Sequence, residues 1–393
     1  MRLPHGRHFG YCTNVHPASS WPELRRVLDG PVRAVRQRVA ARENPFGLGL
    51  WLSCETAESL GEPGALEELK SWLRANGSYV FTLNGFPHGK FHGEAVKENI
   101  YRPDWTTRAR LDYTVRLFEL LAGLLPADVV CGSISTLPGS FKGFGLDDSA
   151  EALIFRNLAE CAVQIDRRRD RHGRDLVLGL EPEPLGWFEN TAETLDFFKK
   201  FFARPDTPRC AREVIGVTCD ACHLAVEFED AADALAAWHD AGIRLAKIHF
   251  SSALRLRPGA AALAALRHFD EPVYLHQVIA RDASGHLRRW HDLPEALAAA
   301  ENLPPLAHGG EWRVHFHVPL HAAPAPPLLD TRENLAGIFD FLARHPALGP
   351  HLEMETYTWA VLPEPLRATA VEEQIAAEYA WTLAQLRQRG LSA

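Results

Sequence analysis

The sequence lacks the features of a secreted or membrane-spanning protein. Its N-terminus, MRLPHGRHFGYC, has no apolar core of the kind that a signal peptide carries, and no run of about 18 apolar residues occurs. The seven cysteines of the 393-residue chain are scattered and odd in number, which does not suit a disulfide framework. We therefore expect a cytoplasmic protein with no membrane span.

The chain also lacks an excess of positive charge. Its formal net charge is -8 and its pI is near 6.2, whereas a general nucleic-acid binder is usually basic. No GxGxxG or GxxxxGK[ST] motif follows the first predicted strand, which counts against a nucleotide-binding fold. We therefore expect a small-molecule substrate and no nucleic-acid partner.

What the sequence does contain is a repeated alternation of apolar strand-like segments with helical segments. The predicted strands are 9–15, 48–53, 79–84, 129–135, 176–181, 214–219, 245–250 and 352–356. The predicted helices are 21–41, with an interruption at Pro31, then 66–76, 106–125, 148–169, 191–202, 231–241, 331–344 and 371–389. Such alternation indicates a parallel sheet with crossover helices, and eight units favour a closed (β/α)8 TIM barrel.

The alternation is broken once, after the seventh predicted strand. Residues 251–327 hold two further predicted strands, 271–280 and 312–319, and a Ser-Gly hairpin signal lies between them. The run APAPP at 323–327 excludes regular structure and marks the return to the barrel. We predict one domain, 1–393, in which this insertion covers the C-terminal face of the barrel.

Metal-binding side chains occur at the ends of four consecutive predicted strands. Glu181, Asp220, His249 and Glu355 belong to the fifth to eighth strands. The carboxyl ends of barrel strands meet at one face, so we expect these groups to converge there. Three carboxylates at one place repel each other, and a divalent ion such as Mn²⁺, Mg²⁺, Co²⁺ or Zn²⁺ would remove that conflict. The alternative is that each residue has a separate structural role.

The pattern leaves two choices open near these residues. Glu353 lies two positions before Glu355, so both point the same way along a strand. We take Glu355 as the ligand because it is nearer the strand end. His223 follows Asp220 by three positions and is either an auxiliary ligand or substrate contact, or a turn histidine bonded to the backbone.

A few further residues are candidates for auxiliary roles. His315 and His317, in VHFHVPLH, can both face a metal or an anionic ligand, or can simply form the polar face of a strand. Lys142 and Trp187, in loops after strands, are candidate substrate contacts, although surface charge and packing are the ordinary roles of such residues. The CDAC segment at 219–222 has the spacing of a redox pair, but no thioredoxin-like unit surrounds it.

Four segments, LGLEPEP, CDACHL, KIHFS and LEMETYTW, resemble the xylose-isomerase-like TIM barrels in order and spacing. That superfamily includes sugar isomerases, ketose epimerases, inosose dehydratases and endonuclease IV nucleases. The longer runs NGFPHGKFHG, VKENIYRPDW, STLPGSFKG, VHFHVPLH and ETYTWAVLP resemble one branch over nearly the whole chain. This branch is the metabolite traffic protein family of the ebo cluster (EboE-like).

The resemblance implies a metal held by Glu181, Asp220, His249 and Glu355. It also implies that the two glutamates act as acid and base on either face of a substrate carbon. The branch further implies a role in moving or maturing a secondary-metabolite precursor, in contact with other proteins of that pathway.

We therefore predict a divalent-metal-dependent, sugar isomerase- or epimerase-like enzyme that acts on a polyhydroxylated or hydroxy-carbonyl metabolite. One alternative is a non-catalytic metabolite-binding or escort protein that keeps the barrel pocket. Another is a metal-dependent phosphoesterase of endonuclease IV type, although the additional metal-binding histidines and basic surface of those enzymes are not clearly present. The sequence specifies neither the substrate, nor the metal, nor the oligomeric state.

Overall fold

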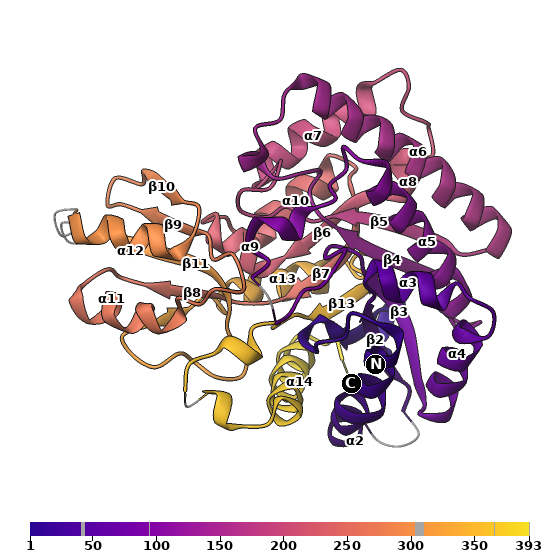
Figure 1. Ribbon diagram of the computed structural model, residues 1–393, viewed down its shortest axis with the longest axis horizontal. Helices are drawn as coiled ribbons and strands as arrows, with labels where there is room; N and C mark the ends of the chain where they lie inside the picture. Colours follow the sequence, from indigo (N-terminus) through magenta and orange to yellow (C-terminus); the bar gives the residue numbers. More distant parts are fainter. Residues whose placement is uncertain (41–43, 94, 303–309, 365, 393) are drawn as a thin grey trace.

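The computed structural model describes residues 1–40, 44–93, 95–302, 310–364 and 366–392. Eight parallel strands form one sheet in the order β1-β13-β7-β6-β5-β4-β3-β2, and helices surround it (Figure 1). A parallel bridge between Cys12 and Gly49 joins the two edges of the sheet where β1 ends. The predicted (β/α)8 barrel is thereby confirmed.

The barrel strands lie close to their predicted positions. They are β1 (His8–Tyr11), β2 (Phe46–Trp51), β3 (Ser78–Asn84), β4 (Cys131–Thr136), β5 (Asp175–Leu180), β6 (Ile215–Asp220), β7 (Arg244–Phe250) and β13 (His351–Met354). Strands that are buried on both faces form continuous apolar runs, which makes them visible in sequence. The first strand is shorter than predicted, because Thr13–Val15 forms a 3₁₀ turn instead.

Helices cover the outside of the sheet. They are α1 (Trp21–Val27), α2 (Arg33–Val39), α3 (Cys54–Leu60), α4 (Ala65–Ala75), α5 (Arg108–Leu124), α6 (Asp148–His172), α7 (Thr191–Ala203), α8 (Ala211–Val214), α9 (Ala221–Val226), α10 (Ala231–Asp240), α13 (Asn334–Arg344) and α14 (Val371–Gln388). The predicted interruption at Pro31 is confirmed, because a π-helical turn, Leu28–Val32, separates α1 from α2. Such a turn tolerates proline, which has no backbone N–H to donate to the helix. The predicted helix end at Ala41 lies outside the described residues.

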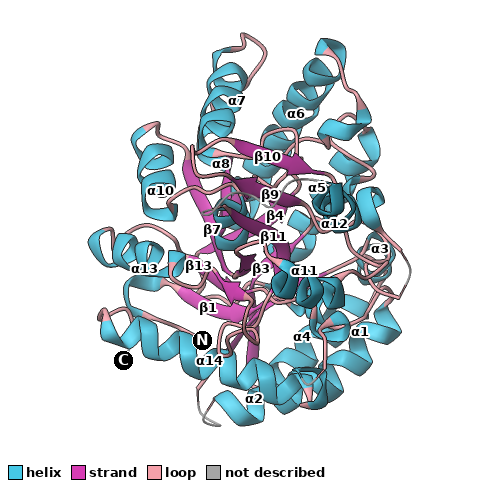
Figure 2. Cartoon of the chain, turned by 90° about the vertical axis from the view of Figure 1, so that its left-hand side faces the viewer, coloured by secondary structure: helices cyan, strands magenta, loops and turns pink. Residues whose placement is uncertain are grey.

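A second sheet, in the order β10-β9-β11-β8-β12, follows β7 and projects from one side of the barrel (Figures 1 and 2). Its elements are β8 (Ala253–Leu256), α11 (Ala260–Leu266), β9 (Val278–Arg281), β10 (Leu287–Trp290), α12 (Leu293–Asn302), β11 (Glu311–His317) and β12 (Leu329–Asp330). Residues 303–309 of the predicted insertion lie outside the described residues.

The strand predicted at 271–280 is wrong before Val278. The Glu271 carboxylate accepts hydrogen bonds from the backbone N–H groups of Val273 (2.8 Å) and Tyr274 (2.9 Å). These bonds use donors that a sheet would otherwise need and turn the chain locally. β8 was not predicted, although it pairs with both β11 and β12.

The barrel interior holds an ion pair just below the strand ends. Lys247 Nζ lies 2.6 Å from Glu353 Oε2, and neither side chain is exposed. Lys247 also donates hydrogen bonds to Leu83 O (3.1 Å) and Ser135 Oγ (3.2 Å). A Cβ atom at position 49 would lie 1.4 Å from Glu353 Oε1, so Gly49 provides the space for this carboxylate. The pair forms the floor of the site described below.

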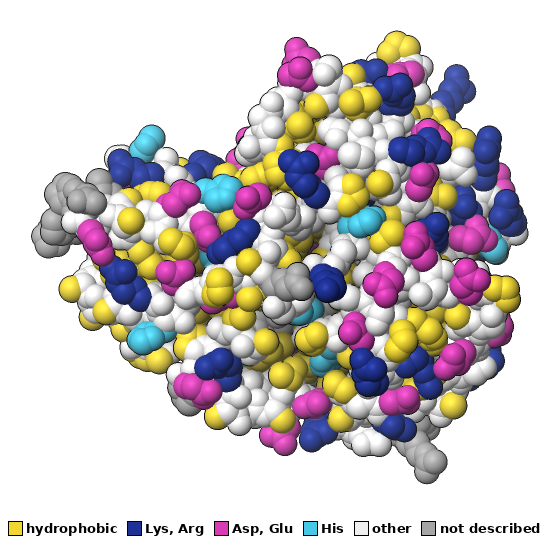
Figure 3. Space-filling model, viewed as in Figure 1, with side chains coloured by type: hydrophobic (Ala, Val, Ile, Leu, Met, Phe, Trp, Pro, Cys, Tyr) yellow, Lys and Arg dark blue, Asp and Glu magenta, His cyan; other side chains and the backbone are white. Residues whose placement is uncertain are grey.

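The outer surface carries charges of both signs. Figure 3 shows Lys and Arg side chains intermingled with Asp and Glu side chains over the face in view. Among the described residues, no helix combines the length and apolar character needed to cross a membrane.

Candidate metal centre

The structure brings Glu181, Asp220, His249 and Glu355 to one point at the carboxyl ends of β5, β6, β7 and β13. His249 Nδ1 lies 3.0 Å from Glu355 Oε2, 3.1 Å from Glu181 Oε1 and 3.5 Å from Asp220 Oδ2. All four side chains are buried. Ligands held about 2.1 Å from one ion are about 3.0–3.4 Å apart, so these distances fit a single coordination shell.

One carboxylate oxygen of Asp220 accepts hydrogen bonds from the protein, and the other accepts none from the described residues. Its Oδ1 accepts hydrogen bonds from Cys222 N (2.7 Å), His223 N (3.2 Å) and Ser251 Oγ (2.6 Å), as the N-cap of α9. Its Oδ2 is buried and has no hydrogen-bond partner among the described residues. A buried carboxylate oxygen without a donor is costly, and a cation would satisfy it.

Glu355 is oriented in the same way. Its Oε1 accepts hydrogen bonds from the amide groups of Asn14 (2.7 Å) and Asn84 (3.0 Å), whereas its Oε2 faces His249. The two asparagines therefore fix the carboxylate so that one oxygen points into the centre. Such outer contacts commonly orient metal ligands.

The structure separates the roles of Glu353 and Glu355. Glu353 lies one layer lower, in register with His249, and pairs with Lys247. Its Oε2 lies 3.3 Å from His249 Nε2, on the side of the ring away from the other three carboxylates. Glu353 is thus placed to orient the imidazole rather than to join the group.

The charged groups of this centre shift the pKa values of one another. Burial alone would lower the pKa of His249, but the carboxylates of Glu355 and Glu181 outweigh it and raise this pKa well above its usual value. Burial opposes ionisation of Asp220, yet His223, His317 and His249 hold the pKa of Asp220 well below its ordinary range. The donor set therefore favours ionised carboxylates, and a divalent cation would balance them.

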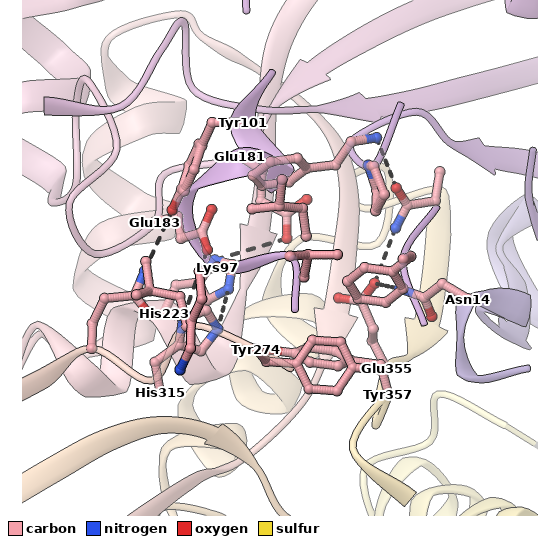
Figure 4. A pocket seen from close by; sticks show the side chains of 18 residues that line it. Asn14, Lys97, Tyr101, Glu181, Glu183, His223, Tyr274, His315, Glu355 and Tyr357 are labelled. Carbon is pink, nitrogen blue, oxygen red and sulfur yellow. Dashed lines mark hydrogen bonds and ion pairs between the residues drawn. The ribbon is translucent and has the colours of Figure 1, made fainter. Parts of the chain in front are cut away.

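Two of the four residues, Glu181 and Glu355, line a pocket (Figure 4). Its lining includes Asn14, Asn84, Phe86, Pro87, Phe91, Val96, Lys97, Ile100, Tyr101, Glu181, Glu183, His223, Tyr274, Leu275, Gln277, His315, Glu355 and Tyr357. Tyr274, Leu275, Gln277 and His315 come from the insertion. The pocket has a volume of about 60 Å³.

The structure places some of the auxiliary candidates in the lining of the pocket and others outside it. His223 and His315 line the pocket, and their Nε2 atoms lie 3.1 Å apart. His317 donates a hydrogen bond from Nδ1 to Glu355 O (2.5 Å). Lys142 and Trp187 are not among the lining residues, and the Lys142 ammonium pairs with Glu193 (2.7 Å) instead.

Sequence reasoning missed several polar residues of the site. Asn14 follows β1 and Asn84 ends β3, so the rule that identified the four candidate ligands would also have found these two. Gln277, which donates a hydrogen bond to Pro184 O (2.9 Å), lies in a loop of the insertion where no sequence period marks it.

The CDAC segment has no disulfide. Cys219 and Cys222 are buried, and all seven cysteines are free. Burial raises the pKa of both thiols, which disfavours the thiolate form that redox chemistry needs.

No protein-family model matches the chain, and no curated protein matches it. Among solved structures, the IOLI protein with a bound zinc atom is similar, with a TM-score of 0.50 and 8% identity over 97% of this chain and 98% of that one. A xylose isomerase domain protein from Alicyclobacillus acidocaldarius gives 0.49 and 14%, over 97% and 99%. D-Psicose 3-epimerase from Clostridium cellulolyticum H10, solved with D-tagatose, gives 0.47 and 14%, over 98% of each chain.

These identities show likeness of fold alone. The likeness to the IOLI structure agrees with the barrel fold of this chain. None of these structures bears on the branch of metabolite traffic proteins.

Proposed function

We propose that this protein is a divalent-metal-dependent isomerase or epimerase that acts on a small hydroxy-carbonyl metabolite. The observation that supports it best is the convergence of four buried side chains, Glu181, Asp220, His249 and Glu355, two of which, Glu181 and Glu355, line a pocket with polar groups. The zinc atom of the similar IOLI protein and the epimerase among the neighbours are consistent with this chemistry.

Glu181 and Glu355 are the proposed proton carriers. Both line the pocket, and they reach it from separate strands, β5 and β13. One carboxylate would take a proton from the carbon beside the substrate carbonyl, and the other would return a proton to the carbon skeleton. A bound divalent cation would supply Lewis-acid polarisation of that carbonyl. The asparagines at Glu355 would hold its carboxylate in position during the transfer.

The pocket favours an uncharged, oxygen-rich substrate. Asn14, Asn84, Tyr101 and Gln277 are neutral hydrogen-bonding residues suited to hydroxyl groups. Among the described lining residues, Lys97 is the one with a fixed positive charge, and its ammonium lies 2.7 Å from Asp292 Oδ2. A phosphate group would therefore find its charge unmatched, which argues against a phosphorylated substrate. Because the enclosed space is small, the substrate is small or the walls open to admit it.

The biological setting remains a prediction from resemblance. The similarity of ETYTWAVLP and related runs to the metabolite traffic family suggests a role in processing or moving a secondary-metabolite precursor. In that setting we propose that the protein works beside other proteins of the same pathway.

Proton transfer next to a carbonyl can be tested by solvent exchange. The protein is freed of metal with a chelator, reloaded with Mn²⁺, Co²⁺, Zn²⁺ or Mg²⁺, and incubated in D₂O with a panel of small hydroxy-ketones and hydroxy-aldehydes. We expect deuterium to enter the carbon next to the carbonyl, detected by NMR, only in the metal-loaded protein. Glu181→Gln should retain a bound ion and lose exchange by about 10²–10⁴-fold, the usual value of a general base.

A matched control is Glu373→Gln, which makes the same change at an exposed position far from the pocket. It should exchange at the wild-type rate. Unchanged exchange in Glu181→Gln would contradict the proton-transfer role. Tight binding of a compound without any exchange, measured by calorimetry, would instead favour an escort protein.

A further inference from the structure

A cluster of buried histidines beside the four-ligand centre has no part in the proton transfer proposed above. His223 lies in α9, and His315 and His317 lie in β11 of the insertion. The rings of His223 and His315 meet edge to face, with centroids 4.7 Å apart. Figure 4 shows these two rings and Glu183 on one side of the pocket, opposite Glu355.

Hydrogen bonds fix the proton position on both of these rings. His223 Nδ1 lies 3.0 Å from Pro182 O, and a carbonyl oxygen only accepts, so Nδ1 carries the hydrogen. His315 Nδ1 lies 2.7 Å from Gln277 Oε1. The Gln277 amide is oriented by its own Nε2, which donates to Pro184 O at 2.9 Å. In its neutral form, each ring therefore presents an unprotonated Nε2 atom.

These two Nε2 atoms lie 3.1 Å apart. Two lone pairs at such a distance repel each other unless a proton or a cation joins them. Two nitrogen ligands of a tetrahedral zinc ion, each 2.0–2.1 Å from the metal, are about 3.3 Å apart. The separation of His223 and His315 thus fits two ligands of one ion. In both residues the Nδ1–H is bonded to an oxygen, as is usual for metal-bound histidine.

Glu183 supplies a carboxylate at the same place. Its Oε1 lies 3.7 Å from His315 Nδ1, and one of its oxygens lies within 4.8 Å of a ring nitrogen of each histidine. Its side chain is only 6% exposed, and its Oε2 has no hydrogen-bond partner among the residues that the structure describes. We propose that Glu183, His223 and His315 bind a second divalent cation beside the four-ligand centre.

The chemistry of this set differs from that of the first centre. Two imidazole nitrogens and one carboxylate suit Zn²⁺ or Co²⁺ better than Mg²⁺, whereas the first centre is mainly carboxylate. All three residues line the pocket, so an open coordination position would face the substrate. This favours a metabolite with a second oxygen-bearing group beyond the reacting carbonyl. The substrate argument rests on the proposed function, but the ion site itself does not.

Counting ions in the full-length protein tests the site. The chelator-treated protein is equilibrated with saturating Zn²⁺, freed of unbound metal and analysed for zinc and protein. We expect two ions per chain in the wild type, one in His315→Ala and one in Glu355→Ala, which removes the oxygen ligand altogether. His286→Ala is the matched control, since it removes a histidine of the insertion from an exposed position outside the pocket, and it should keep two ions. Circular dichroism checks that each variant is folded.

The outcomes separate this site from the proposed function. One ion in the wild type that is lost only in Glu355→Ala overturns the second site and leaves the first. One ion that is lost only in His315→Ala overturns the four-ligand centre and supports the second site. An equal loss of an ion in His286→Ala overturns the assignment to Glu183 and His315, because the loss in His315→Ala would then not be specific to the proposed set. If His315→Ala does not fold, a wild-type count of one is still sufficient to overturn the proposal. Since two ions also suit phosphoester hydrolysis, the D₂O assay decides between the two activities.

Discussion

Single residues in the barrel show how two similar glutamates take different roles. Glu353 and Glu355 point the same way from β13, but Glu353 is one layer deeper and meets Lys247. Glu355 lies past the strand end, where two asparagines hold it beside His249. Depth along the strand, rather than residue type, therefore determines which glutamate belongs to the centre.

The Lys247–Glu353 pair gives a prediction at this scale. Lys247→Met would leave the Glu353 carboxylate buried without its cation, and we expect a loss of about 3–5 kcal/mol in the free energy of unfolding. The double variant Lys247→Met/Glu353→Gln removes both charges and should recover most of that loss. Urea unfolding at fixed metal concentration measures both. Equal stability of the single and double variants would show that the pair is not coupled.

At the scale of elements, the ends of the barrel strands were the most predictable part of the molecule. Buried parallel strands are continuous apolar runs, so a polar residue where a run stops, such as Asp220, is visible in one sequence. The loop of the insertion that contributes Tyr274 and Gln277 has no such period. Its position depends on contacts with distant parts of the chain, such as the Tyr274 hydroxyl near His92 Nδ1 (2.6 Å).

Local hydrogen bonding explains the elements that sequence reasoning missed. The Ser53 side chain accepts a hydrogen bond from Thr56 N (3.0 Å) and starts α3 directly after β2. Such a short helix has too few turns to show a hydrophobic period. β8 was missed for a similar reason, since a four-residue strand is defined mainly by its partners.

The closure of the sheet depends on a glycine in β2. In Gly49→Ala the new Cβ would lie 1.4 Å from Glu353 Oε1 and 3.2 Å from Thr82 Cγ2. Because Lys247 holds the carboxylate, it cannot move aside easily, and we expect a destabilisation of about 1–3 kcal/mol or more. Gly30→Ala is the control, since nothing lies within 4 Å of its added Cβ. In that exposed helical position alanine should be neutral or stabilising, by up to about 1 kcal/mol. Similar urea midpoints for both variants would contradict this account.

Helix α14 contains a carboxyl group whose titration should affect stability. Burial raises the pKa of Glu378 to about 7. The folded state therefore binds more protons than the unfolded state between about pH 4.5 and 7, and stability falls as pH rises through this window. Full ionisation would cost the wild type about 3 kcal/mol.

Glu378→Gln removes this titration and retains an oxygen for the hydrogen bonds from Leu320 N (2.9 Å) and Thr356 Oγ1 (2.8 Å). We expect the variant to resemble the wild type near pH 5 and to be the more stable protein near pH 8. Urea unfolding at several pH values measures the difference. A constant difference across this range would show that Glu378 does not titrate there.

At the scale of the whole molecule, the insertion and the barrel meet around the pocket. Lys97, in the loop after β3, pairs with Asp292 of the insertion, and Arg289 in β10 lies 2.5 Å from Glu227, just after α9. Arg313 in β11 donates a hydrogen bond to Ala225 O (2.6 Å). These contacts connect the roof of the pocket to loops that follow barrel strands. A change at the candidate metal centre can thus alter the stability of both parts.

Metal binding should therefore stabilise the whole fold. Asp220 Oδ2 has no partner among the described residues, and Glu181 and Glu355 face it across His249. A cation that binds only the folded state adds about 2.7 kcal/mol at a concentration one hundred times its dissociation constant. We expect the thermal midpoint to rise by several degrees from chelator to saturating Mn²⁺, Co²⁺ or Zn²⁺, as measured by scanning calorimetry. In Glu355→Gln the rise should shrink, because the shell loses a charged ligand. Equal midpoints with chelator and with each metal would show that the centre binds no cation, and the four side chains would then need a structural explanation.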